Sequence, residues 1–144
     1  MNIVDPILFQ CRVNADQPAI CAPGVRLEPV TYAQLEFMLN SVTRTVLQFG
    51  FKPGDIVGVL LNNKIFHVVL TLALARIGLV TVSCRGRSLP KELSAAAAFV
   101  DAPGPFADVD RIIITDISWA TADGSSVSPG FVASGDELCR IILT

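Results

Sequence analysis

Few side chains in this sequence have the type and spacing that catalysis requires. His67 is the only histidine, so a catalytic or metal site that needs two histidines is excluded. It lies near the start of an apolar segment, where a structural role is favoured over that of a general base. Cys84 ends another apolar run, and only Arg85 and Arg87 supply positive charge nearby. The sequence therefore favours a packed thiol at this position over a nucleophile.

Groups that could bind phosphate or exchange protons are also sparse. The basic segment 84–88, CRGRS, could meet an anion, but one glycine between arginines is more typical of a solvated loop. The sequence has neither G-x-x-x-x-G-K-[ST] nor G-x-G-x-x-G after a strand. Four carboxylates are scattered over predicted loops, which fits solvation better than paired acid–base work: Asp108, Asp110, Asp116 and Asp123. No metal site is predicted.

The composition excludes several classes of function. The 144 residues suit one compact domain, with a net charge of −2, a hydrophobic fraction of 51% and a mean hydropathy of +0.56. This charge gives no electrostatic case for binding nucleic acid. The best candidate for a membrane span, residues 65–84, contains Arg76, which costs about 2.5 to 3.5 kcal/mol at a bilayer centre. No span is predicted, and the hydropathy indicates a surface that other protein covers.

The amino terminus and the cysteines indicate the compartment. The first ten residues, MNIVDPILFQ, lack a basic n-region and a small-residue cleavage site, so they do not form a secretory signal. The four cysteines form no C-x-x-C pair and lie mostly in apolar contexts: Cys11, Cys21, Cys84 and Cys139. We expect reduced thiols in a cytoplasmic protein.

A helix and a hairpin are expected within residues 1–30. Asp5 and Pro6 can begin a short helix, and Pro23-Gly24 suits the turn of a small hairpin, because glycine takes a positive φ easily. The apolar side of this helix would be formed by Ile7, Leu8 and Cys11.

Residues 31–115 have the pattern of a βαβ core. The expected elements are a helix from Thr31 to Gly50, a strand at 56–61, a helix capped by Asn62 or Asn63, and a strand at 79–84. Gln34 completes a capping box with Thr31, because each side chain can bond to the backbone N–H of the other. Near-continuous apolar strands joined by a helix indicate a parallel sheet covered on both sides.

The rest of the chain extends this pattern. We expect a helix from Ser88 to about Val100 and a strand at 111–115. Residues 116–137 are rich in Gly, Ser, Asp and Ala without periodicity, so a flexible, exposed loop is predicted. The last segment, 138–144, is strand-like and ends without a turn or cap. The predicted fold class is α/β: an incomplete doubly wound parallel sheet with helices on both faces.

Five motifs occur in an order that belongs to a known family. They are Asp16-Gln17-Pro18-Ala19, Thr31-Tyr32-Ala33-Gln34-Leu35, Gly50-Phe51-Lys52-Pro53-Gly54-Asp55-Ile56-Val57, Asn62-Asn63 and Gly78-Leu79-Val80-Thr81-Val82. Over residues 16–82, and again over 136–144, the chain resembles the adenylate-forming superfamily of AMP-dependent synthetases and ligases, which includes the acyl-CoA synthetases. It departs from that family at 84–87, where relatives often have proline and asparagine.

The resemblance implies that residues 1–144 are the amino-terminal part of the large AMP-binding domain of a carboxylate-activating ligase. Such an enzyme uses ATP and Mg to convert a carboxylic acid into an acyl-adenylate, and then passes the acyl group to a thiol, commonly coenzyme A. In the family, the strand that corresponds to 138–144 leads into a Ser/Thr/Gly-rich loop that holds the ATP phosphates. Thr144 would be the first residue of that loop.

The same resemblance places the loop lysine, the Mg-binding glutamate and the carboxy-terminal-domain lysine in the remainder of the parent chain. We therefore predict that this chain alone is inactive and that its uncovered apolar faces cause self-association. Two other functions stay open: a stand-alone, non-enzymatic α/β interaction module, or another doubly wound nucleotide-binding enzyme whose fingerprint lies further downstream.

Overall fold

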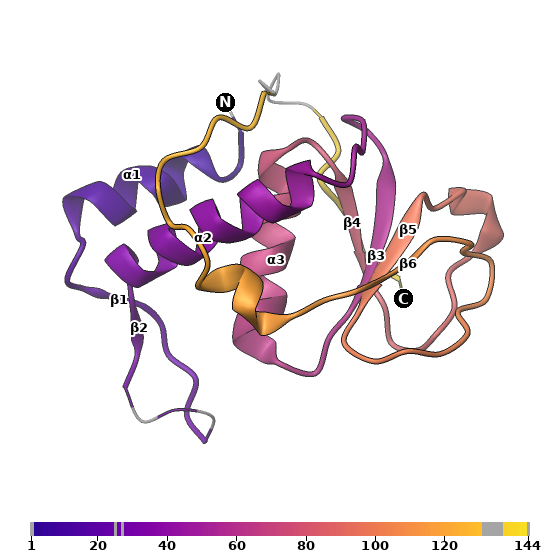
Figure 1. Cartoon of the computed structure of the whole chain (residues 1–144), viewed down its shortest axis with the longest axis horizontal. Helices are drawn as coiled ribbons and strands as arrows, with labels where there is room; N and C mark the ends of the chain where they lie inside the picture. The colour runs from indigo at the N-terminus through magenta and orange to yellow at the C-terminus, as the bar shows by residue number, and fades with distance from the viewer. Residues whose placement is uncertain (1, 25, 27, 131–136, 144) are drawn as a thin grey trace.

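The main feature of the computed structural model is a five-stranded parallel sheet with its α-helices packed against one side (Figure 1). The structure describes residues 2–24, 26, 28–130 and 137–143. The elements are, in chain order, α1 (Asp5–Val13), β1 (Pro18–Ile20), β2 (Val30–Thr31), α2 (Tyr32–Leu47), β3 (Ile56–Leu60), α3 (Lys64–Arg76), β4 (Val80–Ser83), the 3-10 helix η1 (Lys91–Leu93), β5 (Ala97–Val100), β6 (Ile112–Ile114), the 3-10 helix η2 (Ile117–Ala120) and β7 (Arg140–Ile141).

The strands of the sheet follow the order β6-β5-β3-β4-β7. In the centre, Val57 of β3 pairs with Thr81 of β4 on one side and with Ala97 of β5 on the other. All four pairings are parallel, so the predicted doubly wound parallel sheet is confirmed. β1 and β2 form a separate antiparallel pair, as the hairpin prediction requires, and Gly24 between them has a φ of +81°.

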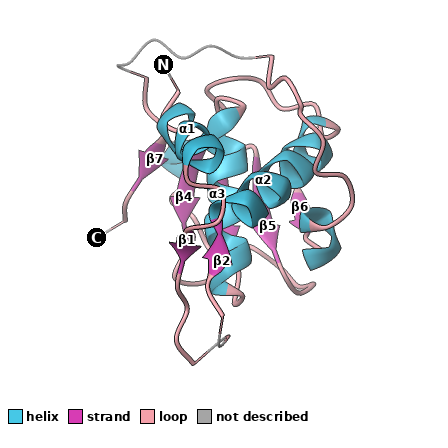
Figure 2. Cartoon of the chain, turned by 90° about the vertical axis from the view of Figure 1, so that its left-hand side faces the viewer, coloured by secondary structure: helices cyan, strands magenta, loops and turns pink. Residues whose placement is uncertain are grey.

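α2 and α3 cover one face of the sheet and lie in front of it in Figure 2. Val57, Val59 and Phe99 of the sheet are fully buried in the same cluster as Leu39 of α2 and Leu70 of α3. Removing each such side chain from water contributes about 1.5–3 kcal/mol, so this layer supplies the main hydrophobic core.

Both long helices begin as their sequences predict. At α2, the backbone N–H of Gln34 donates to the Thr31 hydroxyl at 3.2 Å, and the N–H of Thr31 donates to the Gln34 side chain at 2.9 Å. At α3, Asn63 is the cap, and its side chain accepts a bond from the N–H of Phe66 at 3.0 Å. The capping box is confirmed, and the choice between the two asparagines is decided.

The helix predicted from Ser88 to Val100 is wrong. The segment contains the single turn η1, which stops at Ser94 in a left-handed conformation (φ 49°), and then the strand β5. All four residues of β5 are buried, because this strand is inserted between β3 and β6. A short apolar run that is rich in alanine suits either a buried helix or a doubly covered strand, and only the tertiary pairing distinguishes them.

The second face of the sheet is covered by the segments on either side of β5, residues 84–96, which include η1, and residues 101–110. Val82, Ala98 and Val100 form a buried cluster with the loop residues Phe106 and Val109. This cluster is smaller than the core on the other face. Of the helices predicted on both faces, the α-helices therefore lie on one side, and the other side has only a loop with the single 3-10 turn η1.

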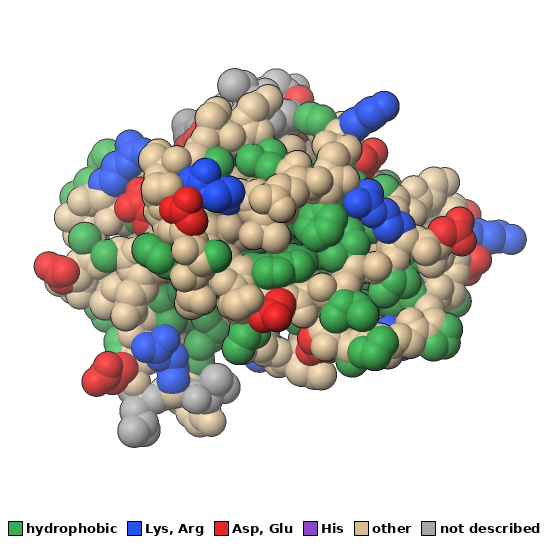
Figure 3. Space-filling model, viewed as in Figure 1, with side chains coloured by type: hydrophobic (Ala, Val, Ile, Leu, Met, Phe, Trp, Pro, Cys, Tyr) green, Lys and Arg blue, Asp and Glu red, His purple; other side chains and the backbone are tan. Residues whose placement is uncertain are grey.

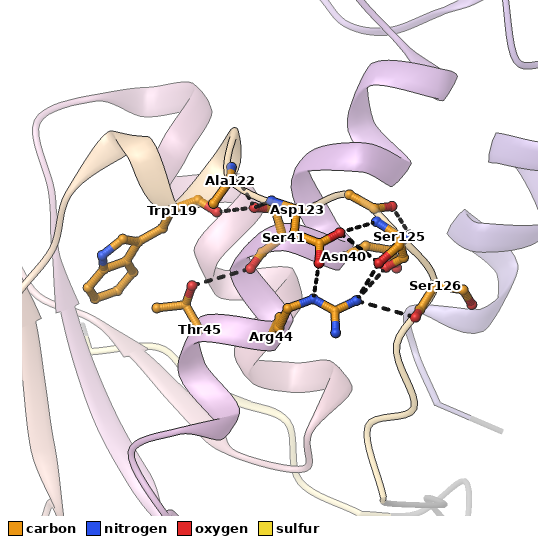
Figure 4. Close-up of polar contacts among 10 residues, drawn as sticks. Asn40, Ser41, Arg44, Thr45, Trp119, Ala122, Asp123, Ser125 and Ser126 are labelled. Atoms are coloured by element: carbon orange, nitrogen blue, oxygen red, sulfur yellow. Dashed lines mark hydrogen bonds and ion pairs between the residues drawn. The ribbon is translucent and has the colours of Figure 1, made fainter.

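The segment 117–127, which we call the strap, follows β6 and lies along α2 (Figure 4). It lies within the predicted loop 116–137, but it starts with η2, and polar side chains of α2 hold its backbone. The Ser41 hydroxyl donates to the carbonyl of Trp119 and accepts bonds from the N–H groups of Ala122 and Asp123, at 3.0 and 3.1 Å.

Further along the strap, Arg44 of α2 donates to the carbonyl and hydroxyl oxygens of Ser125, both at 2.9 Å, and pairs with Asp123 at 3.3 Å. Arg76 of α3 is only 8% exposed and donates to Asn40 Oδ1 at 2.9 Å and to the carbonyl of Val127 at 3.1 Å. The strap is thus bonded to both core helices, and residues 131–136 of the predicted loop lie outside the described residues.

Several large hydrophobic side chains remain exposed, and green side chains appear in several separate groups on the face in Figure 3. Ile142 is 77% exposed, and Leu138 is 60% exposed. Among the helices that the structure describes, none has the length and apolar character needed to cross a membrane.

Candidate functional site

All strands of the sheet are parallel, so their carboxyl ends meet along one edge. From there the chain leaves β3 towards β4 and leaves β5 in the opposite direction, towards β6. Open α/β sheets bind ligands beyond such a reversal, because the loops on its two sides separate. Across it, the N–H of Asn62 donates to Asp101 Oδ2 at 2.7 Å. This edge is the candidate functional site.

Three polar side chains meet at the β4 and β7 end of this edge. Arg140 of β7 donates to the hydroxyl of Ser83, the last residue of β4, at 2.9 Å. His67 of α3 lies with Nε2 at 3.3 Å from the same hydroxyl. Burial, reinforced by the positive charges of Arg140 and Lys64, lowers the pKa of His67. The imidazole is therefore neutral near pH 7 and does not add to the positive charge here.

A cavity of about 640 Å³ opens beyond the carboxyl ends of β4 and β7. Its lining residues are Arg85, Gly86, Ser88, Leu89, Pro90, Asp108, Ile142 and Leu143. An added Cβ on Gly86 would meet no atom within 4 Å, so the backbone there is open to close approach by a ligand. Thr144, the predicted first residue of the phosphate loop, lies outside the described residues, but the two residues before it line this cavity.

The basic segment CRGRS divides between two roles. Arg85 lines the cavity, where a guanidinium can meet an anion. Arg87 instead donates to the carbonyl oxygens of Ala102, Pro103 and Gly104, and so holds the loop after β5. Arg87 therefore fits the predicted ordinary loop, whereas Arg85 fits the alternative of a contact with an anion.

Cys84 is half-buried next to the cavity. The thiol packs against Gly58, where an added Cβ would lie 2.9 Å from Sγ. Burial raises the pKa of the Cys84 thiol. A raised pKa leaves little thiolate at neutral pH, so the packed thiol expected from the sequence fits this environment.

Two of the four scattered carboxylates, Asp116 and Asp123, serve local structure. Asp116 accepts a bond from the N–H of Ser118 at the start of η2, and Asp123 accepts bonds from the N–H and hydroxyl of Ser125 within the strap. These hydrogen bonds lower the pKa of both carboxyls. Asp108 alone lines the cavity. In the part of the chain that the structure describes, no three His, Cys, Asp or Glu side chains form a group that could hold a metal ion.

Sequence reasoning missed three residues of this edge: Ser83, Asp101 and Arg140. Each follows or interrupts an apolar strand, and that polar position at a strand end is the signal that could have found them.

A second, larger cavity of about 760 Å³ lies at the opposite edge, where β3 and β4 begin, and its lining is mostly apolar, with residues such as Ile56, Leu79 and Leu138. It offers no group of side chains for catalysis among the described residues.

A parallel sheet with this reversal and an open cavity at its carboxyl edge defines an α/β domain of the ligand-binding, doubly wound class. Solved structures with the same fold are known. The amino-terminal subdomain of NpsA from Klebsiella oxytoca matches 99% of this chain and 38% of its own, with a TM-score of 0.82. Its sequence identity to this chain is 17%, so this likeness establishes the fold alone.

The family follows from the sequence. The family model of the AMP-binding enzymes matches residues 9–132, and the chain belongs to that family. The resemblance to adenylate-forming enzymes is therefore confirmed. Among curated proteins, long-chain fatty acid transport protein 1 of Rattus norvegicus is 46% identical over 50 residues, and 3-oxocholest-4-en-26-oate–CoA ligase of Rhodococcus rhodochrous is 29% identical over 93 residues.

These curated relatives are much longer than the matched region. The match to the rat protein covers 35% of this chain and 8% of that protein, and the match to the Rhodococcus ligase covers 65% of this chain and 16% of that ligase. The matched region thus spans less than a fifth of the length of each of these curated relatives.

Proposed function

We propose that this chain is the first part of the AMP-binding domain of an ATP-dependent ligase that activates a carboxylic acid and transfers the acyl group to a thiol such as coenzyme A. The observation that carries the proposal is the position of β7. It pairs with β4 at the edge of the sheet, and the residues after it, Ile142 and Leu143, line the cavity at the carboxyl edge. A loop that starts at Thr144 would enter that cavity.

The residues of the cavity fit part of a phosphate site. Arg85 supplies a cation, Ser88 a hydroxyl, and Gly86 a backbone that a phosphate oxygen can approach closely. Asp108 on the same lining repels an anion, so the described residues can form one wall of the site and not all of it. ATP supplies the adenylyl group that makes the carboxylate a mixed anhydride with a good leaving group.

Catalysis would require more of the parent chain. In-line attack by a carboxylate on a nucleotide phosphate needs screening of the phosphate charge and fixed orientation of both reactants. One arginine and an open glycine do not supply that screening, so we place the Mg ligands and the remaining phosphate contacts in the remainder of the parent chain. The 144 residues alone are then inactive.

The proposal is tested by ATP–pyrophosphate exchange with a panel of aliphatic, aromatic and sterol-derived carboxylic acids. The full-length product of the reading frame should exchange labelled pyrophosphate into ATP with at least one acid class, while the 144-residue chain should not exceed a blank. Absence of exchange by the full-length protein with every acid would overturn the proposed activity. Exchange by the 144 residues would overturn the proposed inactivity of this part.

Self-association of the isolated chain follows from the same proposal. Ile142 and Leu138 flank β7 and are strongly exposed, which suits a surface that further protein covers in the parent. In sedimentation velocity, the chain should form concentration-dependent oligomers, and Ile142→Lys should shift it towards monomer. Gln48→Lys, which adds the same charge at an exposed uncharged residue after α2, is the control and should leave the distribution unaltered. A sharp monomer at high concentration would contradict self-association.

A further inference from the structure

The attachment of β7 to the sheet is short. Arg140 pairs with Thr81, and Ile141 pairs with Val82. Just before the paired residues, the N–H of Thr81 donates to the carbonyl of Cys139 at 3.1 Å. In the described part of the chain β7 is the last strand at this side of the sheet. With so short a ladder, side-chain bonds form a large share of what holds β7 in place.

The hydroxyl of Ser83 forms side-chain hydrogen bonds with two residues on different elements. Thr81, which pairs with Arg140, and Ser83 are two residues apart in β4. Their side chains therefore lie on the same face of the strand. Arg140 NH2 lies 2.9 Å from Ser83 Oγ, and His67 Nε2 lies 3.3 Å from it. Ser83 therefore joins the helix α3 to the strand β7 through β4.

The direction of these hydrogen bonds depends on the charge of His67. A guanidinium can only donate, so Ser83 accepts from Arg140 and keeps its own hydrogen free to donate. Neutral His67 accepts that hydrogen at Nε2 when its proton is on Nδ1. A protonated imidazole carries hydrogens on both nitrogens, so Nε2 can no longer accept the Ser83 hydrogen, and Ser83 Oγ can then bond to both cations only by accepting a hydrogen from each.

Charge acts in the same direction. Arg140 faces His67 from β7, Lys64 acts on it from its own helix, and β4 faces it with the uncharged hydroxyl of Ser83. The charged groups that act on His67 are thus both cations. Adding a proton to His67 repels Arg140, whose exposed side chain can move into water at little cost.

We propose that Ser83 is a pH-sensitive latch for β7: with neutral His67 it holds Arg140 and the strand, and protonation of His67 releases them. Arg140 and Ser83 are positioning residues in this arrangement. The consequence for a phosphate loop after Thr144 rests on the proposed function, because β7 is the strand that would lead into that loop. The latch itself rests only on the three side chains.

The latch is tested by NMR on the 144-residue chain without ATP or acid, between pH 8 and pH 5. The imidazole C–H of His67 should titrate with a midpoint below 6.5, and the backbone N–H signals of Ile141 and Ile142 should shift with the same midpoint. Because no activity is measured, failure of the ligase proposal in the exchange assay leaves this result unaffected, and the converse also holds.

Two variants make the test specific. His67→Gln should abolish the titration of the Ile141 and Ile142 signals, and Arg140→Gln should raise the His67 midpoint because it removes a neighbouring cation. Arg140 is exposed, so its variant remains informative even if the His67 variant fails to fold. The latch is overturned if the β7 signals titrate in His67→Gln, if their midpoint differs from that of His67, or if Arg140→Gln leaves the His67 midpoint unchanged.

Discussion

The ring of Phe37 in α2 lies directly against Gly124 in the strap: a Cβ on Gly124 would come within 2.0 Å of Cδ2 of that ring. The carbonyl of Gly124 also accepts a bond from the Asn40 side chain at 3.1 Å. The strap can approach α2 this closely only where it has no side chain. Glycine at this position therefore allows the polar contacts of Ser41 and Arg44 to form.

Gly124→Ala should destabilise the protein by about 1–3 kcal/mol, because the added methyl group overpacks the contact with Phe37. Gly86→Ala, where no atom lies within 4 Å, is the matched control and should change stability by less than about 0.5 kcal/mol. Urea unfolding measures both. The double variant Phe37→Ala with Gly124→Ala should lose less than the sum of the single losses, and strict additivity would contradict the contact.

Arg76→Met should cost about 2 kcal/mol, because Asn40 Oδ1 and the Val127 carbonyl lose a buried donor. Arg44→Met is the control. Arg44 also bonds to the strap, but it is more exposed, and such surface pairs contribute about 0–1 kcal/mol. The measurement is the free energy of unfolding in urea. Equal losses in the two variants would show that burial of Arg76 has no special importance.

Gly58→Ala should destabilise the smaller core by about 1–3 kcal/mol. A Cβ there would lie 2.8 Å from Leu89 Cδ1 and 2.9 Å from Cys84 Sγ, and Gly58 is in the central strand, which cannot shift easily. Thermal unfolding should show a lower Tm. Adding Cys84→Ala should restore part of the loss by making room, and a Gly58→Ala variant with an unchanged Tm would mean that the segment 84–96 adapts freely.

Stability should fall as the pH drops below about 6.5, and His67 should be one cause. The pKa of His67 is lowered in the folded protein, mainly by burial, so the unfolded chain binds a proton at a higher pH than the folded chain does. As the pH falls, this loss of stability begins near the pKa of His67 in the unfolded chain and is complete below the pKa of His67 in the folded protein. Unfolding at pH 8 and pH 5 should show a smaller difference in His67→Gln than in the natural sequence. An equal difference would exclude His67 as a contributor.

Prediction from the sequence succeeded where the signal was local. The capping box of Thr31 and Gln34 and the Asn63 cap are short-range contacts, and the structure contains both. It failed for residues 88–100, because alanine locally favours a helix, and the pairing of β5 between β3 and β6 overrode that preference. It also missed the contacts of the strap, since Ser, Asp and Gly in a non-periodic segment give no indication of a partner.

The sequence by itself determined the class of fold and the family, because capped helices, glycine turns and apolar strands are encoded within a few residues of one another. Only the tertiary structure decided the site. Ser83 and Arg140 are 57 residues apart, and Ser41 and Trp119 are 78 apart. Such pairs meet because the sheet order brings β7 beside β4 and the strap lies along α2. No local pattern contains the strand order, since it depends on which surfaces pack together across the whole chain.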